Sequence, residues 1–145
     1  MSVAFTKEDS AETASEIGLG VTLPLLSSAT GHIFLAYGSS RLIRDRVESE
    51  LAEQQLAEIP GIPRDHATLA ELQRHIRRQK YATVDGRIFP GYSALSVPIL
   101  NWQEEAAAAI TITSRDTALL GAEGPIHKFM MNVADEISLR GPIPA

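Results

Sequence analysis

The sequence predicts an α+β domain in which helices flank an antiparallel sheet. Residues 69–76 and 125–137 carry apolar side chains at the spacing of amphipathic helices. Residues 93–100 and 106–113 instead alternate along one face, as strands do, and the connection at Asn101–Glu104 is short enough to make them a hairpin. This mixture of helices and hairpin strands favours helices packed on an antiparallel sheet over a parallel α/β arrangement.

Composition limits the class of protein before any motif is considered. The 145 residues suffice for one domain, and a net charge of −5 gives no positive surplus to attract a phosphate backbone. The absence of cysteine excludes disulfides, thiolate metal sites and cysteine nucleophiles. No apolar stretch approaches the ~20 residues that span a bilayer. We therefore expect a cytoplasmic domain with no membrane partner and no direct contact to DNA.

The chain divides into a short N-terminal piece and one domain. Residues 1–20 predict a partial strand at 2–6 followed by an acidic loop. The domain is expected over residues 21–141, where a weakly alternating run at 17–25 predicts its first strand.

Three helices should follow that first strand. Ser27 or Ser28 can cap a helix that ends near Tyr37, with Gly38 as its stop. A second helix should start at Ser39 or Ser40 and reach about Glu58, burying a stripe of Ile43, Val47 and Leu51. In the third helix Thr68 and Glu71 suggest a capping box, and the inward residues are Leu69, Leu72 and Ile76.

The C-terminal part predicts three extended runs and a last helix. The runs cover 82–84, 93–100 and 106–113. Pro125 occupies the first position of the helix and Gly141 lies at its stop. Its predicted inward stripe is Ile126, Phe129, Met130, Val133 and Ile137.

Alternation along the hairpin separates two faces with different chemistry. One face is largely apolar and should pack on helices: Ser93, Leu95, Val97, Ile99, Ile110 and Ile112. The other face carries small and hydroxyl residues: Tyr92, Ala94, Ser96, Thr111 and Thr113. Small side chains leave space above a sheet, and hydroxyls can donate and accept hydrogen bonds. This second face is therefore a candidate binding surface.

The start of the first helix could supply the other wall of such a pocket. Ser28, Ala29, Thr30 and Gly31 open that helix with small side chains, unpaired N–H groups and the positive end of the helix dipole. A carboxylate would fit there. The alternative is that Ser28 only caps the helix and Gly31 only permits close packing.

The order of these segments resembles the C-terminal effector-binding domain of IclR-type transcriptional regulators. The resemblance covers roughly Gly20 to Arg140. Its pieces are Leu23-Pro24-Leu25, Ala29-Thr30-Gly31 with Phe34-Leu35-Ala36, the helix from Glu71 to Arg78 leading to Tyr81-Ala82, Gly91 with Ala94 to Pro98, and Ala108 to Thr113.

The resemblance implies a GAF-like antiparallel sheet flanked by helices that binds a small effector, commonly an organic or aromatic acid. It also implies a homodimer or homotetramer, and DNA contact only through an N-terminal winged helix-turn-helix domain, which is absent from this chain. Carried over by position, the family pocket corresponds to the backbone at Ala29 and Thr30, the position near Asp85, and four strand residues, Ala94, Ser96, Thr111 and Thr113. The hairpin argument selects the same strand residues.

Three positions depart from the family pattern. Lys80 stands where a glycine usually follows the basic helix, so a non-glycine residue must accept a left-handed conformation. Arg87 replaces a usual acidic residue, which leaves open whether the effector is more strongly anionic or Arg87 points to water. Asn101–Glu104 replaces the usual Asp…Gly hairpin turn.

We expect neither an enzyme, a metal site nor a cofactor. The histidines at 32, 66, 75 and 127 lack paired ligand spacing, and His32 reads as a helix-surface or pocket-rim residue. Trp102 and Met131 are candidate subunit contacts. Two alternatives to an effector sensor stay open: a small stand-alone enzyme on a GAF-like scaffold, with Asp85 as its titratable group, and an assembly module whose pocket is filled.

Overall fold

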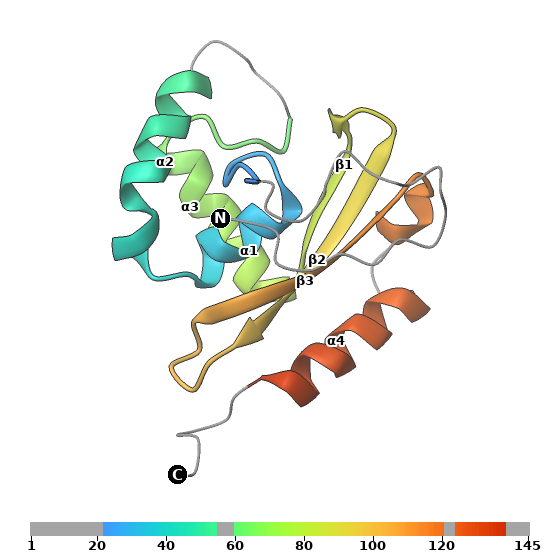
Figure 1. Ribbon diagram of the computed structural model, residues 1–145. Helices are drawn as coiled ribbons and strands as arrows, with labels where there is room; N and C mark the ends of the chain where they lie inside the picture. The colour runs from blue at the N-terminus through green and yellow to red at the C-terminus, as the bar shows by residue number, and fades with distance from the viewer. Residues whose placement is uncertain (1–21, 55–59, 121–123, 139–145) are drawn as a thin grey trace.

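The computed structural model describes residues 22–54, 60–120 and 124–138. The strand predicted at 2–6, the acidic loop, the end of the second helix near Glu58 and the stop at Gly141 lie outside them. Figure 1 shows the described elements in chain order: helices α1 (Ala29–Tyr37), α2 (Ser40–Gln54) and α3 (His66–Gln79), strands β1 (Ala82–Phe89), β2 (Tyr92–Leu100) and β3 (Ala106–Ser114), the 3-10 helix η2 (Thr117–Leu120), and helix α4 (Pro125–Ile137).

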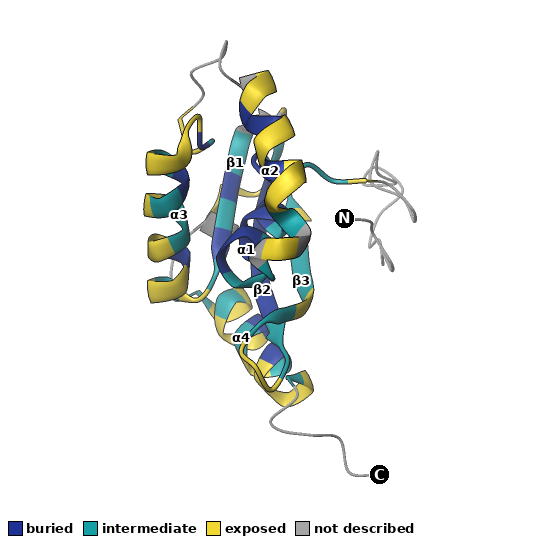
Figure 2. Cartoon of the chain, turned by 90° about the vertical axis from the view of Figure 1, so that its left-hand side faces the viewer, coloured by how far each residue is buried: buried dark blue, intermediate teal, exposed yellow. Residues whose placement is uncertain are grey.

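The helices cover both faces of a three-stranded antiparallel sheet with strand order β1-β2-β3. Helix α1 lies on one face and α4 on the other, while α2 and α3 flank α1 on its outer side (Figure 1). The most buried residues gather along α1 and β2, at the centre of these layers (Figure 2). The predicted α+β class is confirmed. Among the described residues no helix has the length and apolarity to cross a membrane.

Strand register confirms the two faces that alternation predicts. Leu95 pairs with Ile112 and Val97 with Ile110, and this apolar face packs on Met130 of α4. Ser96 pairs with Thr111 on the opposite face, beneath α1. Strand β1 is longer than predicted because it continues through an irregular pairing to Phe89.

Helix α1 begins as predicted and ends by a different device. Ser28 is its N-cap, and the Ser28 hydroxyl accepts a hydrogen bond from the Gly31 amide. Gly38 follows the helix with φ −75°, an extended conformation rather than the left-handed one of a glycine cap. The carbonyls of Leu35 and Ala36 are instead satisfied by α3, whose Gln73 and Arg77 side chains donate to them.

One local prediction in the first half of the chain is wrong. The capping box of α3 lies three residues earlier than expected: Asp65 is the N-cap, its carboxylate accepts from the Thr68 amide, and the Thr68 hydroxyl accepts from the Asp65 amide. Of the strand predicted at 17–25 only residues 22–25 are described: Thr22 forms an isolated bridge, and the path after it is irregular. Hydrogen bonds from that path go to side chains, as described below, instead of to a ladder.

The inward stripe predicted for α4 is partly wrong. Met130 and Ala134 are the residues buried against the sheet. Ile126, Phe129 and Ile137 are 45%, 67% and 50% exposed. The helix is therefore rotated relative to its apolar stripe, and one apolar flank faces outward.

Both unusual turn positions take the left-handed conformation. Lys80, at the C-cap of α3, has φ 70°, as the missing glycine predicts. Glu104 in the β2–β3 turn has φ 61°. That turn is organised by Asn101, whose Oδ1 accepts from the amides of Gln103 and Glu105.

Candidate functional site

Residues 24–26 form an irregular segment that sets the position of the α1 N-terminus. The amides of Leu25 and Leu26 donate to the two carboxylate oxygens of Glu50 in α2, at 3.0 and 2.8 Å. The Ser28 hydroxyl donates to the carbonyl of Pro24 at 2.6 Å. Glu50 is buried, and Arg46 donates to it at 2.9 Å. Side chains thus supply the partners that a β-ladder would give this backbone.

His32 belongs to the same arrangement, and the expectation that it lies on a helix surface or pocket rim is wrong. It is 2% exposed, and its Nε2 lies 2.7 Å from the carbonyl of Leu26. A carbonyl can only accept, so Nε2 carries the proton of a neutral imidazole. Burial lowers the pKa of His32, and the Leu26 carbonyl offsets this in part.

We expect the free energy of unfolding to fall as the pH drops below 6.5, the ordinary pKa of histidine. Above that pH the imidazole is neutral in both states. Below it the unfolded chain takes up a proton that the folded chain resists, which costs at most about 1.4 kcal/mol per pH unit until the lowered folded pKa is reached. Urea denaturation above and below pH 6.5 measures this for the wild type and His32→Gln.

The amide of His32→Gln can donate the same hydrogen bond without titrating, so it is the matched control. The stability difference between wild type and this variant should shrink, or turn against the wild type, as the pH falls. A stability difference between wild type and His32→Gln that does not change with pH would contradict the lowered pKa of His32.

Gly31 is held against backbone. A Cβ built there would lie within 2.6 Å of the carbonyl oxygens of Pro24 and Leu25 and the Cα of Leu25. With the Ser28 hydroxyl committed to the cap and to Pro24, both residues have structural roles. These contacts agree with the alternative reading of the sequence, in which Ser28 caps the helix and Gly31 permits close packing.

Three hydroxyls meet where α1 crosses the small-residue face of the sheet. The Thr111 hydroxyl lies 2.6 Å from that of Thr30 and 2.8 Å from that of Ser96. The first contact joins residues that are 81 positions apart in the sequence, and the second joins residues that are 15 positions apart. We call Thr30, Ser96 and Thr111 the hydroxyl cluster. Its Thr30–Thr111 contact leaves no space for a ligand atom between those two oxygens in this conformation.

The remaining predicted site residues surround this cluster at different depths. Ala29 and Ala94 pack on each other with Val84, so the small side chains let the helix approach the sheet. Thr113 pairs with Ala94 on the same face and is exposed. Asp85 is half-buried, follows Val84 where the regular β1–β2 pairing stops, and has a polar interaction of its own.

The start of α1 also offers free donors. The amides of Ala29 and Thr30 have no hydrogen-bond partner in the part of the chain that the structure describes. Together with the hydroxyl cluster they can bind oxygens of an anionic or polar ligand. Within residues 22–54, 60–120 and 124–138, no cluster of three or more histidine, aspartate or glutamate residues could hold a metal ion.

A separate hollow of about 280 Å³ lies between Pro24 and α2. Its lining is more polar than apolar and includes the buried Glu50: Pro24, Arg46, Ser49, Glu50 and Glu53. Sequence reasoning missed Glu50, as it missed Gln73 and Arg77. The available signal was a carboxylate three residues after Val47 on the inward stripe of α2.

The sequence matches a known protein family over most of its length. A sequence profile described as the C-terminal domain of the bacterial transcriptional regulator IclR matches residues 5–139. No functionally curated protein sequence matches the chain.

Solved structures share the fold. The chain is similar to Pseudomonas aeruginosa HmgR, with TM-score 0.67 and 30% identity, over 83% of this chain and 46% of that one. An IclR transcriptional regulator from Alicyclobacillus acidocaldarius gives 0.63 and 26%, over 83% and 47%. The inducer-binding domain of Acinetobacter PobR, solved as a double mutant with 3-hydroxybenzoic acid, gives 0.66 and 21%, over 93% and 75%. The chain thus spans about half the length of the first and second of these.

Proposed function

Because the chain belongs to the IclR family of bacterial transcriptional regulators, through their GAF-like C-terminal domain, we propose that it senses a small organic or aromatic acid. The observation that carries the proposal is the hydroxyl cluster, which joins the sheet to the first turn of α1, where two amides have no partner among the described residues. Amide and hydroxyl donors on one side suit a carboxylate or a phenolic oxygen. PobR, whose fold is similar, was solved with a hydroxybenzoic acid, which supports this class of ligand.

Binding would then act by favouring one arrangement of subunits over another. We include in the proposal a homodimer or homotetramer in the cytoplasm, with DNA contact made by a winged helix-turn-helix outside this domain. The ligand has to separate Thr30 from Thr111, since their hydroxyls touch in the present conformation. A shift of α1 on the sheet is the structural change that would carry the signal.

Thr111→Val should weaken binding of the acid by about 1–3 kcal/mol, because a ligand oxygen loses its hydroxyl partner while the side-chain shape is kept. Thr113→Val, on the same face, should act in the same direction. Calorimetric titration with 3-hydroxybenzoate and a panel of small aromatic and aliphatic carboxylates measures the effect. Thr117→Val, on the exposed η2 helix, is the matched control and should bind as the wild type does.

The direct contact of Thr30 with Thr111 also favours a second candidate, an assembly module whose pocket is filled. The same titration separates the two. If no carboxylate binds and none raises the melting temperature, the sensor proposal fails and the assembly module stands. If an acid binds with unchanged affinity in both threonine variants, the hydroxyls are not its contacts.

A further inference from the structure

Helix α4 buries the ring nitrogens of a histidine in an apolar setting. Both nitrogens of His127 are buried, and neither has a hydrogen-bond partner among the described residues. The ring packs instead against Tyr81, which directly precedes β1, with ring centroids 4.5 Å apart and the ring planes at 70°. A neutral imidazole carries one donor and one acceptor, and folded proteins rarely leave such buried groups unpaired. The described position of α4 is therefore unfavourable for this side chain.

The opposite flank of the same helix has the reverse mismatch. Ile126 and Phe129 are 45% and 67% exposed. On a helix with 3.6 residues per turn, they lie with Val133 on one side of the buried Met130, and His127 lies on the other side. We call Ile126, Phe129 and Val133 the apolar flank. Helix α4 thus buries polar atoms on one side while large apolar side chains meet water on the other.

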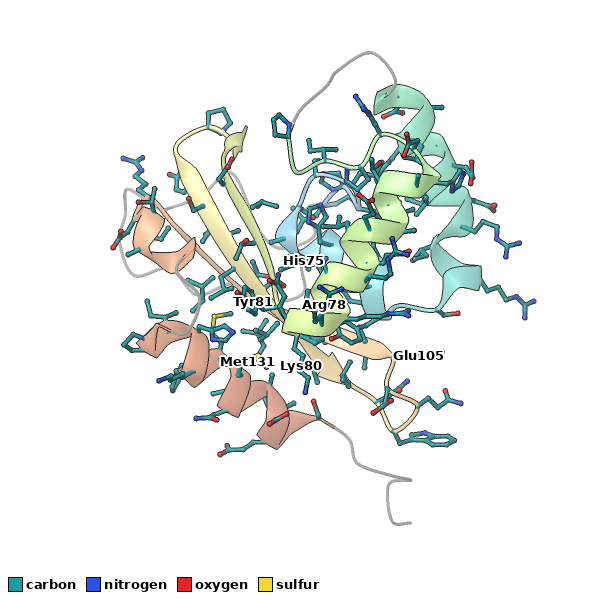
Figure 3. All side chains as sticks on the ribbon, turned by 180° about the vertical axis from the view of Figure 1, so that it is seen from behind. His75, Arg78, Lys80, Tyr81, Glu105 and Met131 are labelled. Carbon is teal, nitrogen blue, oxygen red and sulfur yellow. The ribbon has the colours of Figure 1, made fainter. Side chains whose placement is uncertain are left out.

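The sheet beneath α4 determines which strand each flank faces. Because His127 contacts Tyr81 at the start of β1, its side of the helix faces β1, and Figure 3 shows Met131 of α4 near Tyr81. With the strand order β1-β2-β3, the apolar flank faces β3. Ile110 and Ile112 of β3 belong to the face on which α4 packs, and both are only partly buried. Strand β3 therefore offers apolar surface to the apolar flank.

We propose that α4 is a two-position element that rolls across the sheet toward β3. A roll of roughly 60° about the helix axis brings the apolar flank onto β3 and carries His127 away from Tyr81 into water. Met130 lies between the two flanks and stays on the sheet in both positions. The described position keeps Met131 and Tyr81 packed on the buried cluster, which the rolled position gives up. Each position thus satisfies groups that the other does not.

The strands that support α4 also carry the hydroxyl cluster. In β2, Ser96 of the cluster lies between Leu95 and Val97, which pack on α4 from the opposite face. Thr111 alternates in the same way along β3. An acid that spreads the cluster therefore changes the surface on which α4 rests. The inference depends on the proposed function only for this trigger, because the two positions exist without a ligand.

Single cysteines test the roll, because the chain contains none of its own. Phe129→Cys replaces an exposed side chain and should react quickly with N-ethylmaleimide, whereas Met131→Cys, in the packed flank, should react slowly. Adding His127→Arg favours the rolled position, since a charged side chain is not tolerated where the imidazole lies. Labelling should then slow at position 129 and accelerate at position 131, each by roughly tenfold, which mass spectrometry measures.

His127→Leu provides a second test that introduces no charge. It removes the unpaired groups and so favours the described position, which should slow labelling at position 131 further and leave position 129 fast. Lys128→Cys is the matched control. Position 128 lies on the outer side of α4 and is exposed in both positions, so its labelling should be equal in all three backgrounds.

Each other outcome overturns the roll. Faster labelling at position 131 without slower labelling at position 129 means that α4 detaches from the sheet, and unchanged labelling at both means that it is fixed. Slower labelling at position 129 alone, increasing with protein concentration, means that a second chain covers the apolar flank. No ligand enters these measurements, so their failure leaves the acid-sensor proposal standing. Conversely, a chain that binds no carboxylate can still show the reciprocal labelling.

Discussion

Glu50→Ala is expected to destabilise the fold by about 2–5 kcal/mol, a large part of the 5–15 kcal/mol typical of a domain. The carboxylate accepts from the amides of Leu25 and Leu26, both in buried residues. Alanine leaves these two donors without an acceptor, and Arg46 loses its partner as well. An unsatisfied buried donor costs about 1–3 kcal/mol, and hydrogen bonds to a charged group lie at the upper end. Urea denaturation near neutral pH measures the change.

Two further variants test whether the lost hydrogen bonds to Glu50 cause the destabilisation. Glu53→Ala removes an exposed carboxylate from the same helix and should change stability by less than about 0.5 kcal/mol. Glu50→Gln keeps the shape and one acceptor oxygen but turns an NH₂ group toward a backbone N–H, so it should recover only part of the loss. Faster hydrogen exchange at Leu25 and Leu26 in Glu50→Ala would locate the damage in residues 24–26. A Glu50→Ala protein as stable as Glu53→Ala would refute the assignment.

Sequence patterns predicted the elements whose signals are local. The Ser28 cap and the proline at the start of α4 are each decided within one helical turn. The faces of the β2–β3 hairpin follow from alternation, which register then confirms. The capping box of α3 was placed wrongly because Thr68 and Glu71 match its pattern as well as Asp65 and Thr68 do, and the choice depends on where the helix begins.

Features that depend on contacts distant in sequence were not predictable. Glu50 lies 25 residues from Leu25, and nothing near Leu25 indicates that its amide needs a carboxylate. The burial of His32 has the same origin, because its partner Leu26 has an irregular backbone that no periodicity describes. The orientation of α4 depends on how Met130 and Ala134 pack against the sheet. Sequence alone therefore named the residues of the candidate site but not the segment that positions it.

The hydroxyl cluster was likewise predictable from sequence only in part. Alternation placed Ser96 and Thr111 on one face, and capping placed Thr30 on the first turn of α1. Their direct contact depends on how closely α1 approaches the sheet. That distance is set by Ala29 against Ala94 and by the attachment of residues 24–26 to α2. A variant that moves α1 should therefore disturb the candidate site as well as stability.

Gly31→Ala is such a variant, and we expect it to destabilise the fold by about 3 kcal/mol or more. Helix propensity alone predicts the opposite, a gain of about 1 kcal/mol. The new methyl group, however, would lie within 2.6 Å of backbone atoms of Pro24 and Leu25, which cannot rotate away as a side chain can. Overpacking costs about 1–3 kcal/mol where neighbours can adjust. Here adjustment would break the bonds of Leu25 and Leu26 to Glu50, so the cost should exceed that range.

The matched control for Gly31→Ala is Gly61→Ala. Gly61 has φ 89° and nothing within 4 Å of a built Cβ, so alanine there meets backbone strain without a collision and should cost about 1 kcal/mol. For a chain of this size a 3 kcal/mol loss lowers the melting temperature by roughly 6–12 °C, which calorimetry resolves. If Gly31→Ala is as stable as the wild type, α1 has room to lift from residues 24–26. The start of that helix, including Thr30 of the hydroxyl cluster, would then not be held in place.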